Sequence, residues 1–128
     1  SGWCAIPAVI EGMAKIVDGG WETIMQHNHD LAIQGRDILC KRLGIEQPCP
    51  DEMIACISTI QLPGEIPAKE KMYEPDPLHH LLSKKYNIQV PVWSWPSPEG
   101  RYLRISAQLY NSIEQYEFLA DALVNELK

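Results

Sequence analysis

The chain has 128 residues, of which 45% are hydrophobic and 22% charged, as expected of one globular domain with a buried core. Its net charge of −6 argues against broad binding to nucleic acid or to an anionic membrane. The sequence contains no run of about 18 apolar residues, so it predicts no membrane span.

In the first third of the chain, the sequence predicts two helices. The first covers residues 5–17, with Pro7 tolerated in its first turn, and Asp18-Gly19-Gly20 ends it. The second covers residues 21–43, where apolar residues recur with a 3.6-residue period. Gly44 follows as the expected C-cap. Gly35 lies within the apolar stripe and is expected to let another element approach closely.

The middle of the chain predicts a strand, a connector and a helix. Residues 53–62 read as a largely buried strand, and residues 64–75 as a proline-rich, charged connector. Asp76 and Pro77 then form a good helix start, an N-cap followed by proline at the first helical position. That helix is expected to continue to residue 86.

The last third predicts two strands and a closing helix. Residues 88–95 form a strand that Pro91 assigns to the edge of a sheet. Residues 102–111 alternate polar and apolar side chains, which indicates a strand with one buried face. Asn111 is expected to cap the final helix, with Glu114 completing a capping box. The order ααβαββα predicts a single α+β domain over residues 1–128, in which an antiparallel sheet of about three strands packs against helices.

The spacing of the histidines and cysteines predicts neither a metal site nor a framework of disulfides. His27 and His29 are two apart on a predicted helix, and His79 and His80 are adjacent, so neither pair suits a shared metal ion. The four cysteines include no CxxC pair and no zinc-ligand rhythm, which favours reduced thiols in a cytoplasmic protein.

Two features remain as candidates for a binding site. Trp93 and Trp95 lie on one face of a predicted strand, where two indoles either wall a pocket or cover the sheet. Arg104 lies in the middle of the polar face of the strand that follows. From the residues alone, Arg104 is either a solvated surface arginine or part of a site.

The C-terminal third resembles the end of class V aminotransferases, which depend on pyridoxal phosphate. The match rests on "IQVPV", then "LRISAQLYN", then a closing helix of acidic and apolar residues. Upstream, "AIPAVIEGM", "GGWETIMQHNHDLAIQGRDILCKRLG" and "PCPDEMIACISTIQLP" are most similar to the isopenicillin N epimerase branch of that family. The resemblance extends over nearly the whole chain.

The resemblance implies that the chain is the C-terminal small domain of such an enzyme. The large domain, which carries the catalytic lysine and pyridoxal phosphate, would lie outside the chain, and the full-length protein would be a homodimer acting on an amino acid. A start at Ser1 without a methionine agrees with this expectation. None of the seven lysines has the strand-end His-Lys context of the family, so no catalytic, cofactor-binding or metal-binding residue is predicted here.

The same resemblance assigns a role to Arg104. In the family, the arginine of the "R-x-S-x-x-x-Y-N" strand binds the α-carboxylate of the substrate, and that position falls on Arg104. Arg101 is the nearest rival for this role. Epimerisation, transamination, desulfuration and β-elimination remain open as the reaction. The alternative is a free-standing, non-enzymatic α+β module that binds a small carboxylate or a protein.

Overall fold

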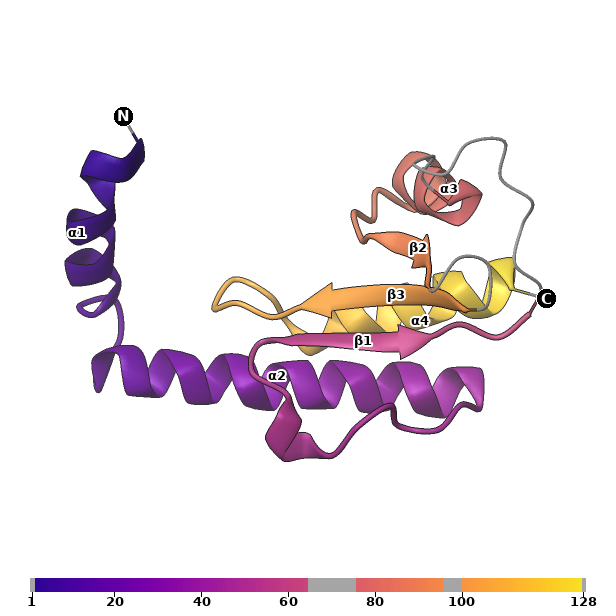
Figure 1. Cartoon of the computed structure of the whole chain (residues 1–128), viewed down its shortest axis with the longest axis horizontal. Coiled ribbons are helices and arrows are strands. Elements are labelled where there is room, and N and C mark those ends of the chain that lie inside the picture. Colours follow the sequence, from indigo (N-terminus) through magenta and orange to yellow (C-terminus); the bar gives the residue numbers. More distant parts are fainter. Residues whose placement is uncertain (1, 65–75, 96–99, 128) are drawn as a thin grey trace.

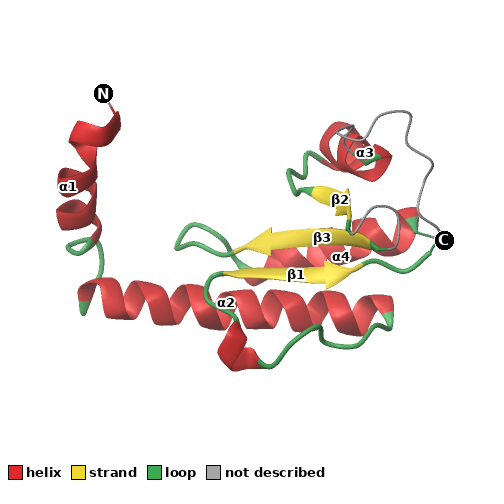
Figure 2. Cartoon of the chain, viewed as in Figure 1, coloured by secondary structure: helices red, strands yellow, loops and turns green. Residues whose placement is uncertain are grey.

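The computed structural model describes residues 2–64, 76–95 and 100–127 (Figure 1). Its elements are α1 (Gly2–Met13), α2 (Gly20–Leu43), a 3-10 turn η1 (Asp51–Met53), β1 (Ile57–Gln61), α3 (Pro77–Tyr86), β2 (Val92–Ser94), β3 (Arg101–Ser106) and α4 (Ile113–Glu126). The predicted α+β class and the ααβαββα order are confirmed (Figure 2). Most of the predicted connector lies outside the described residues. Among the described helices, none is long and apolar enough to cross a membrane.

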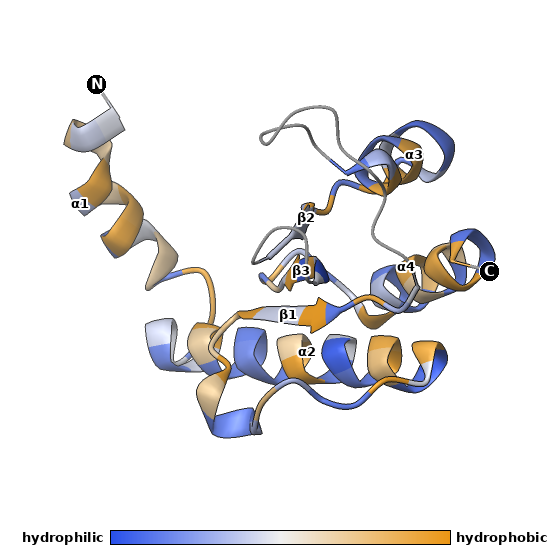
Figure 3. Cartoon of the chain, turned by 45° about the vertical axis from the view of Figure 1, so that its right-hand side comes forward, coloured by the Kyte–Doolittle hydropathy of each residue, from blue (hydrophilic) through white to orange (hydrophobic). Residues whose placement is uncertain are grey.

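The three strands form one antiparallel sheet with the order β1-β3-β2. β2 is an edge strand, as Pro91 predicted. Helix α2 packs against α4 and against β1 and β3, while α3 lies near β2 and α4 (Figure 1). In the view of Figure 3, α3 and α4 lie on one side of the strands and α1 on the other. The helices that pack onto the sheet cover one of its faces, and we call the other its open face.

The core lies between that covered face and the helices. Each large element except α1 contributes at least one side chain that is almost completely buried, namely Leu39, Ile60, Leu82, Leu103 and Leu123. Burial of such side chains is the main favourable contribution to folding, at about 1.5–3 kcal/mol each. The body of the domain therefore has a core of its own, and α1 takes no part in it.

Two of the predicted helix ends, at Gly44 and at Asp76, are confirmed. Gly44 ends α2 in the left-handed conformation, with φ of 66°, and its N–H bonds to the carbonyl of Cys40. Asp76 caps α3, since its carboxylate accepts a hydrogen bond from Leu78 N at 2.9 Å. Local chemistry alone specified these ends.

The predicted strand over residues 53–62 was too long and wrong in its burial. Asp51–Met53 is a 3-10 turn, and the strand starts only at Ile57. Within β1, buried and more exposed residues alternate, because helices cover only one face of the sheet. The predicted strand over residues 88–95 likewise shortens to Val92–Ser94, since proline at position 91 has no N–H to donate to a ladder.

The predicted cap of the last helix was one residue off. Ser112 is the N-cap of α4, and Gln115 is its capping-box partner, accepting from Ser112 N at 3.3 Å. The Asn111 side chain instead accepts a hydrogen bond from Gln108 N at 3.0 Å, which closes the loop after β3. Asparagine competes for either role, and the loop geometry decided which it took.

The close approach predicted at Gly35 is confirmed. A Cβ added to this residue of α2 would lie 2.9 Å from a ring carbon of Tyr116 on α4 and 3.1 Å from a methyl of Ile105 on β3. Three elements therefore meet at a point that has no room for a side chain.

Gly35→Ala should lower the free energy of unfolding by about 1–3 kcal/mol, because the methyl group overpacks the junction. Urea denaturation followed by circular dichroism measures this. Gly12→Ala is the matched control, since an added Cβ there meets nothing within 4 Å and alanine is the better helix former. A Gly35→Ala protein as stable as the original would contradict the close packing.

Candidate functional site

Arg104 projects from the open face of the sheet. Its neighbours Leu103 and Ile105 are buried on the helix-covered face, whereas Arg104 is exposed. Among the described residues, no ion pair involves Arg104. The guanidinium group of Arg104 is therefore held on the central strand, with its N–H donors available to a ligand. The orientation predicted from the alternating pattern is confirmed.

An aromatic pair lies beside Arg104 on the open face. Trp93 on β2 pairs in register with Tyr102 on β3, and their ring centroids are 6.5 Å apart with a tilt of 32°. Tyr102 precedes Arg104 by two residues, so both share one face. Gly100 allows this arrangement, because a Cβ there would lie 2.5 Å from the Tyr102 ring. Thr59 of β1 lies directly opposite Arg104.

The two tryptophans expected to share a face differ in their surroundings. Trp93 is half-buried within β2, whereas Trp95 lies just beyond the strand and is 67% exposed. The structure therefore brings Trp93 to the neighbourhood of Arg104, with Tyr102 as its partner. Tyr102 was not among the residues predicted for a site, although its position two residues before Arg104 was a usable signal.

A cavity of about 490 Å³ borders Arg104 on the edge of β3 that β2 leaves uncovered. Its lining comes from the second half of β3, the end of α3 with the chain that leads to β2, and the loop after β3 with the first half of α4. Polar groups enter it from Arg104, Asn111 and Gln115, and apolar ones from Val90 and Leu119. This volume lies in the range typical of small-molecule sites.

Two hydrogen-bonded tyrosines stabilise the walls of this cavity. The Tyr116 hydroxyl donates to the Ser106 carbonyl at 2.8 Å, and burial raises the pKa of that hydroxyl, so it stays neutral. The Tyr86 hydroxyl donates to Glu126 at 2.6 Å, as Lys85 does at 2.7 Å. The hydrogen bond from Lys85, followed by that from Tyr86, lowers the pKa of Glu126.

Arg101, the rival for carboxylate binding, is already paired. Its Nε and Nη2 donate to the two oxygens of Asp76 at 2.9 and 2.5 Å, and both side chains are almost fully buried. Asp76 also caps α3, so one carboxylate joins the start of α3 to the start of β3. The sequence predicted the cap and missed the ion pair, because 25 residues separate the partners.

A buried amide contact supports the loop that follows β3. Asn28 on α2 donates from Nδ2 to Gln108 Oε1 at 3.0 Å, and that oxygen also accepts from Leu109 N at 2.9 Å. Together with the hydrogen bond to Asn111, these bonds give the polar residues of the "AQLYN" segment a structural role: they hold the loop after β3 in place. In the described ranges, no group of three or more His, Cys, Asp or Glu residues could hold a metal ion.

Comparison with known proteins gives relatives of one name. The chain is 29% identical over 124 residues to a protein named probable L-cysteine desulfhydrase, chloroplastic, and 30% identical over 138 residues to one named L-cysteine desulfhydrase, both of Arabidopsis thaliana. It is 28% identical over 137 residues to a putative L-cysteine desulfhydrase 2 of Oryza sativa subsp. japonica. These alignments cover 92–96% of the chain but only 26–30% of each relative. No family model matches the chain.

Asp76→Asn should destabilise the domain by about 3–5 kcal/mol, because it leaves the buried Arg101 charge without its partner. The control is Asp121→Asn, which breaks an exposed pair with Arg42 and should cost less than about 1 kcal/mol. Urea denaturation of the two variants compares them. An equal loss of unfolding free energy in the two variants would mean that the Asp76–Arg101 pair stabilises the domain no more than a surface pair does.

Proposed function

We propose that the chain is the C-terminal small domain of a pyridoxal-phosphate-dependent enzyme that acts on an amino acid. The resemblance to class V aminotransferases supports the cofactor, and the names of the relatives support an amino acid as the substrate. The epimerase-like branch was suggested by the resemblance, whereas the relatives' names favour removal of sulfide from L-cysteine. We therefore propose β-elimination of sulfide from L-cysteine, in which the Cα proton is lost and the Cβ–S bond breaks, as the reaction of the whole enzyme.

The observation that carries the proposal is the exposed Arg104 on the open face. A guanidinium group offers two parallel N–H donors, which fix both the position and the orientation of a carboxylate. Arg104 has no ion-pair partner among the described residues, so its fork is available to a ligand. It is held on the central strand of the sheet, which suits the precise positioning of a substrate.

The described lysines lack the buried setting expected of a residue that holds pyridoxal phosphate. Lys15, Lys41, Lys84 and Lys85 are all exposed, and Lys85 is paired with Glu126. We therefore assign the cofactor to the large domain outside this chain. Bound pyridoxal phosphate would stabilise the carbanion at the substrate Cα. The contribution of this chain is to hold the substrate carboxylate at Arg104, with the Trp93–Tyr102 pair as one wall beside it.

The second candidate is a free-standing module that binds a small carboxylate. The cavity beside Arg104 favours it, since polar and apolar groups of this chain alone converge there. The two candidates differ in whether residues 1–128 bind a carboxylate without any further protein.

Arg104→Ala in the full-length enzyme should lower kcat/KM by roughly thirty- to several-thousand-fold, which corresponds to about 2–5 kcal/mol for losing one partner of a desolvated charge pair. Arg104→Lys should recover only part of the loss, because a point charge replaces a two-pronged fork. Steady-state kinetics measure the activity, and visible absorbance verifies that cofactor binding is intact. Arg42→Ala, an exposed arginine on α2, is the control. Full activity in Arg104→Ala would disprove the carboxylate role.

Residues 1–128 alone should fold and yet show no absorbance of a pyridoxal phosphate Schiff base after incubation with the cofactor. Absorbance spectroscopy and mass spectrometry after borohydride reduction test this. Stoichiometric labelling of any lysine would refute the assignment of the cofactor to another domain. Titration with acetate and glycine, followed by NMR, tests the second candidate: saturable shifts that vanish in Arg104→Ala would favour the free-standing module.

A further inference from the structure

Helix α1 carries an apolar side that nothing described covers. Its twelve residues include one charged side chain, Glu11, and none of the twelve is buried. Trp3, Ile6 and Ile10 recur at spacings of three and four, so they lie on one side of the helix. Trp3 is 82% exposed, and Figure 3 shows how much of α1 is hydrophobic. Contiguous exposed apolar surface of this kind marks an interaction site.

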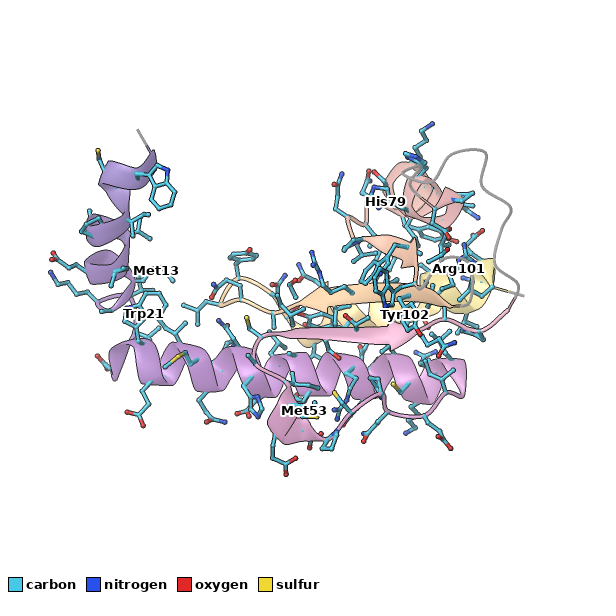
Figure 4. The ribbon with its side chains drawn as sticks, viewed as in Figure 1. Met13, Trp21, Met53, His79, Arg101 and Tyr102 are labelled. Carbon is cyan, nitrogen blue, oxygen red and sulfur yellow. The ribbon has the colours of Figure 1, made fainter. Side chains whose placement is uncertain are left out.

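The same apolar surface continues around the corner between α1 and α2. Trp21 and Met25 on the first turns of α2 are exposed, although both are large and hydrophobic. Met13 and Trp21 lie at this corner (Figure 4). We define the docking surface as Trp3, Ile6, Val9, Ile10, Trp21 and Met25. Each of these six side chains is at least 37% exposed.

The direction of α1 is set by the corner itself. Gly19 and Gly20 have φ values of 85° and 61°, a left-handed conformation that favours glycine. The indole N–H of Trp21 donates to the carbonyl of Ile10 at 3.0 Å and ties the two helices together. Because none of its residues is buried, α1 is held away from the body as a preformed arm, visible at the N-terminal end of the chain in Figure 1.

We propose that the docking surface seats the rest of a longer polypeptide to which this chain belongs. The inference rests on the proposed function, because it takes the chain to be one domain of a larger enzyme. The matched relatives are long enough for this, since the chain spans only 25–30% of their length. A covalently attached partner acts at high effective concentration, so a modest surface is sufficient for stable docking.

A lipid surface fits α1 less well. Helices that lie on membranes carry Lys and Arg on their polar side, which attract anionic lipids. α1 has neither residue within Gly2–Met13, and the whole chain has a net charge of −6. A second copy of the protein is the remaining occupant, and the experiment separates it from the rest of the same polypeptide.

The test is photo-crosslinking in the full-length protein with p-benzoylphenylalanine at position 6. A 1:1 mixture of unlabelled and ¹⁵N-labelled subunits is denatured, refolded and irradiated without cofactor, and its crosslinked peptides are analysed by mass spectrometry. Crosslinks from position 6 to peptides outside residues 1–128, with both peptides carrying the same isotope, are expected. Mixed-isotope crosslinks would identify a second copy as the occupant, and a lack of crosslinks would mean an unoccupied surface; both overturn the proposal.

Hydrogen exchange provides a second readout with matched variants. In the full-length protein, amide exchange over residues 2–13 should be slower than in residues 1–128 alone by a factor of roughly ten or more. Ile6→Glu with Ile10→Glu should abolish this protection. Ala8→Glu is the control, because Ala8 lies on the opposite side of α1. Equal exchange in the long and short proteins would contradict docking.

These outcomes are independent of the proposed reaction. Both measurements use cofactor-free protein, so α1 is expected to be protected whether or not the enzyme is active. If the full-length protein fails to bind pyridoxal phosphate while the crosslinks within one chain are found, the proposed function falls and the docking surface stands. If cofactor binding and activity are normal and the crosslinks are mixed or absent, only the docking proposal falls.

Discussion

The close contact at Gly35 is the constraint on which the rest of the fold depends. It lets α2 approach both Tyr116 on α4 and Ile105 on β3, so two helices and the central strand share one junction. Because α2 and α4 pack on the face of the sheet that carries Ile105, that face is covered and the opposite face is open. The alternation of buried and more exposed residues along β1 and β3 follows from this division, including the exposure of Arg104.

The two arginines of β3 illustrate how strand geometry assigns chemistry. Arg101 and Arg104 are three residues apart, so they point to opposite faces of the sheet. Arg101 points to the covered face, where burying a guanidinium is tolerable only with a paired carboxylate, and Asp76 provides it. Arg104 points to the open face, where water or a ligand solvates it. One strand therefore carries a structural arginine and an available one.

The domain divides into a self-sufficient body and an exposed arm. The body has buried side chains from all its helices and strands, whereas α1 adds no buried residue. An exposed helix of apolar residues is what one part of an interface looks like. The chain covers only 26–30% of the length of two relatives, which agrees with a longer protein. Arg104 and α1 would then both serve the same longer protein, one towards its substrate and the other towards its remaining chain.

The sequence by itself determined the features that depend on neighbouring residues. The helix periods, the Gly44 and Asp76 caps, the edge position of β2 and the orientation of Arg104 all follow from local pattern and backbone chemistry. Only the tertiary structure decided how far β1 and β2 extend, that Ser112 rather than Asn111 caps α4, and that Asp76 pairs with Arg101. These outcomes depend on which groups meet across many residues of chain, and no local pattern encodes that meeting.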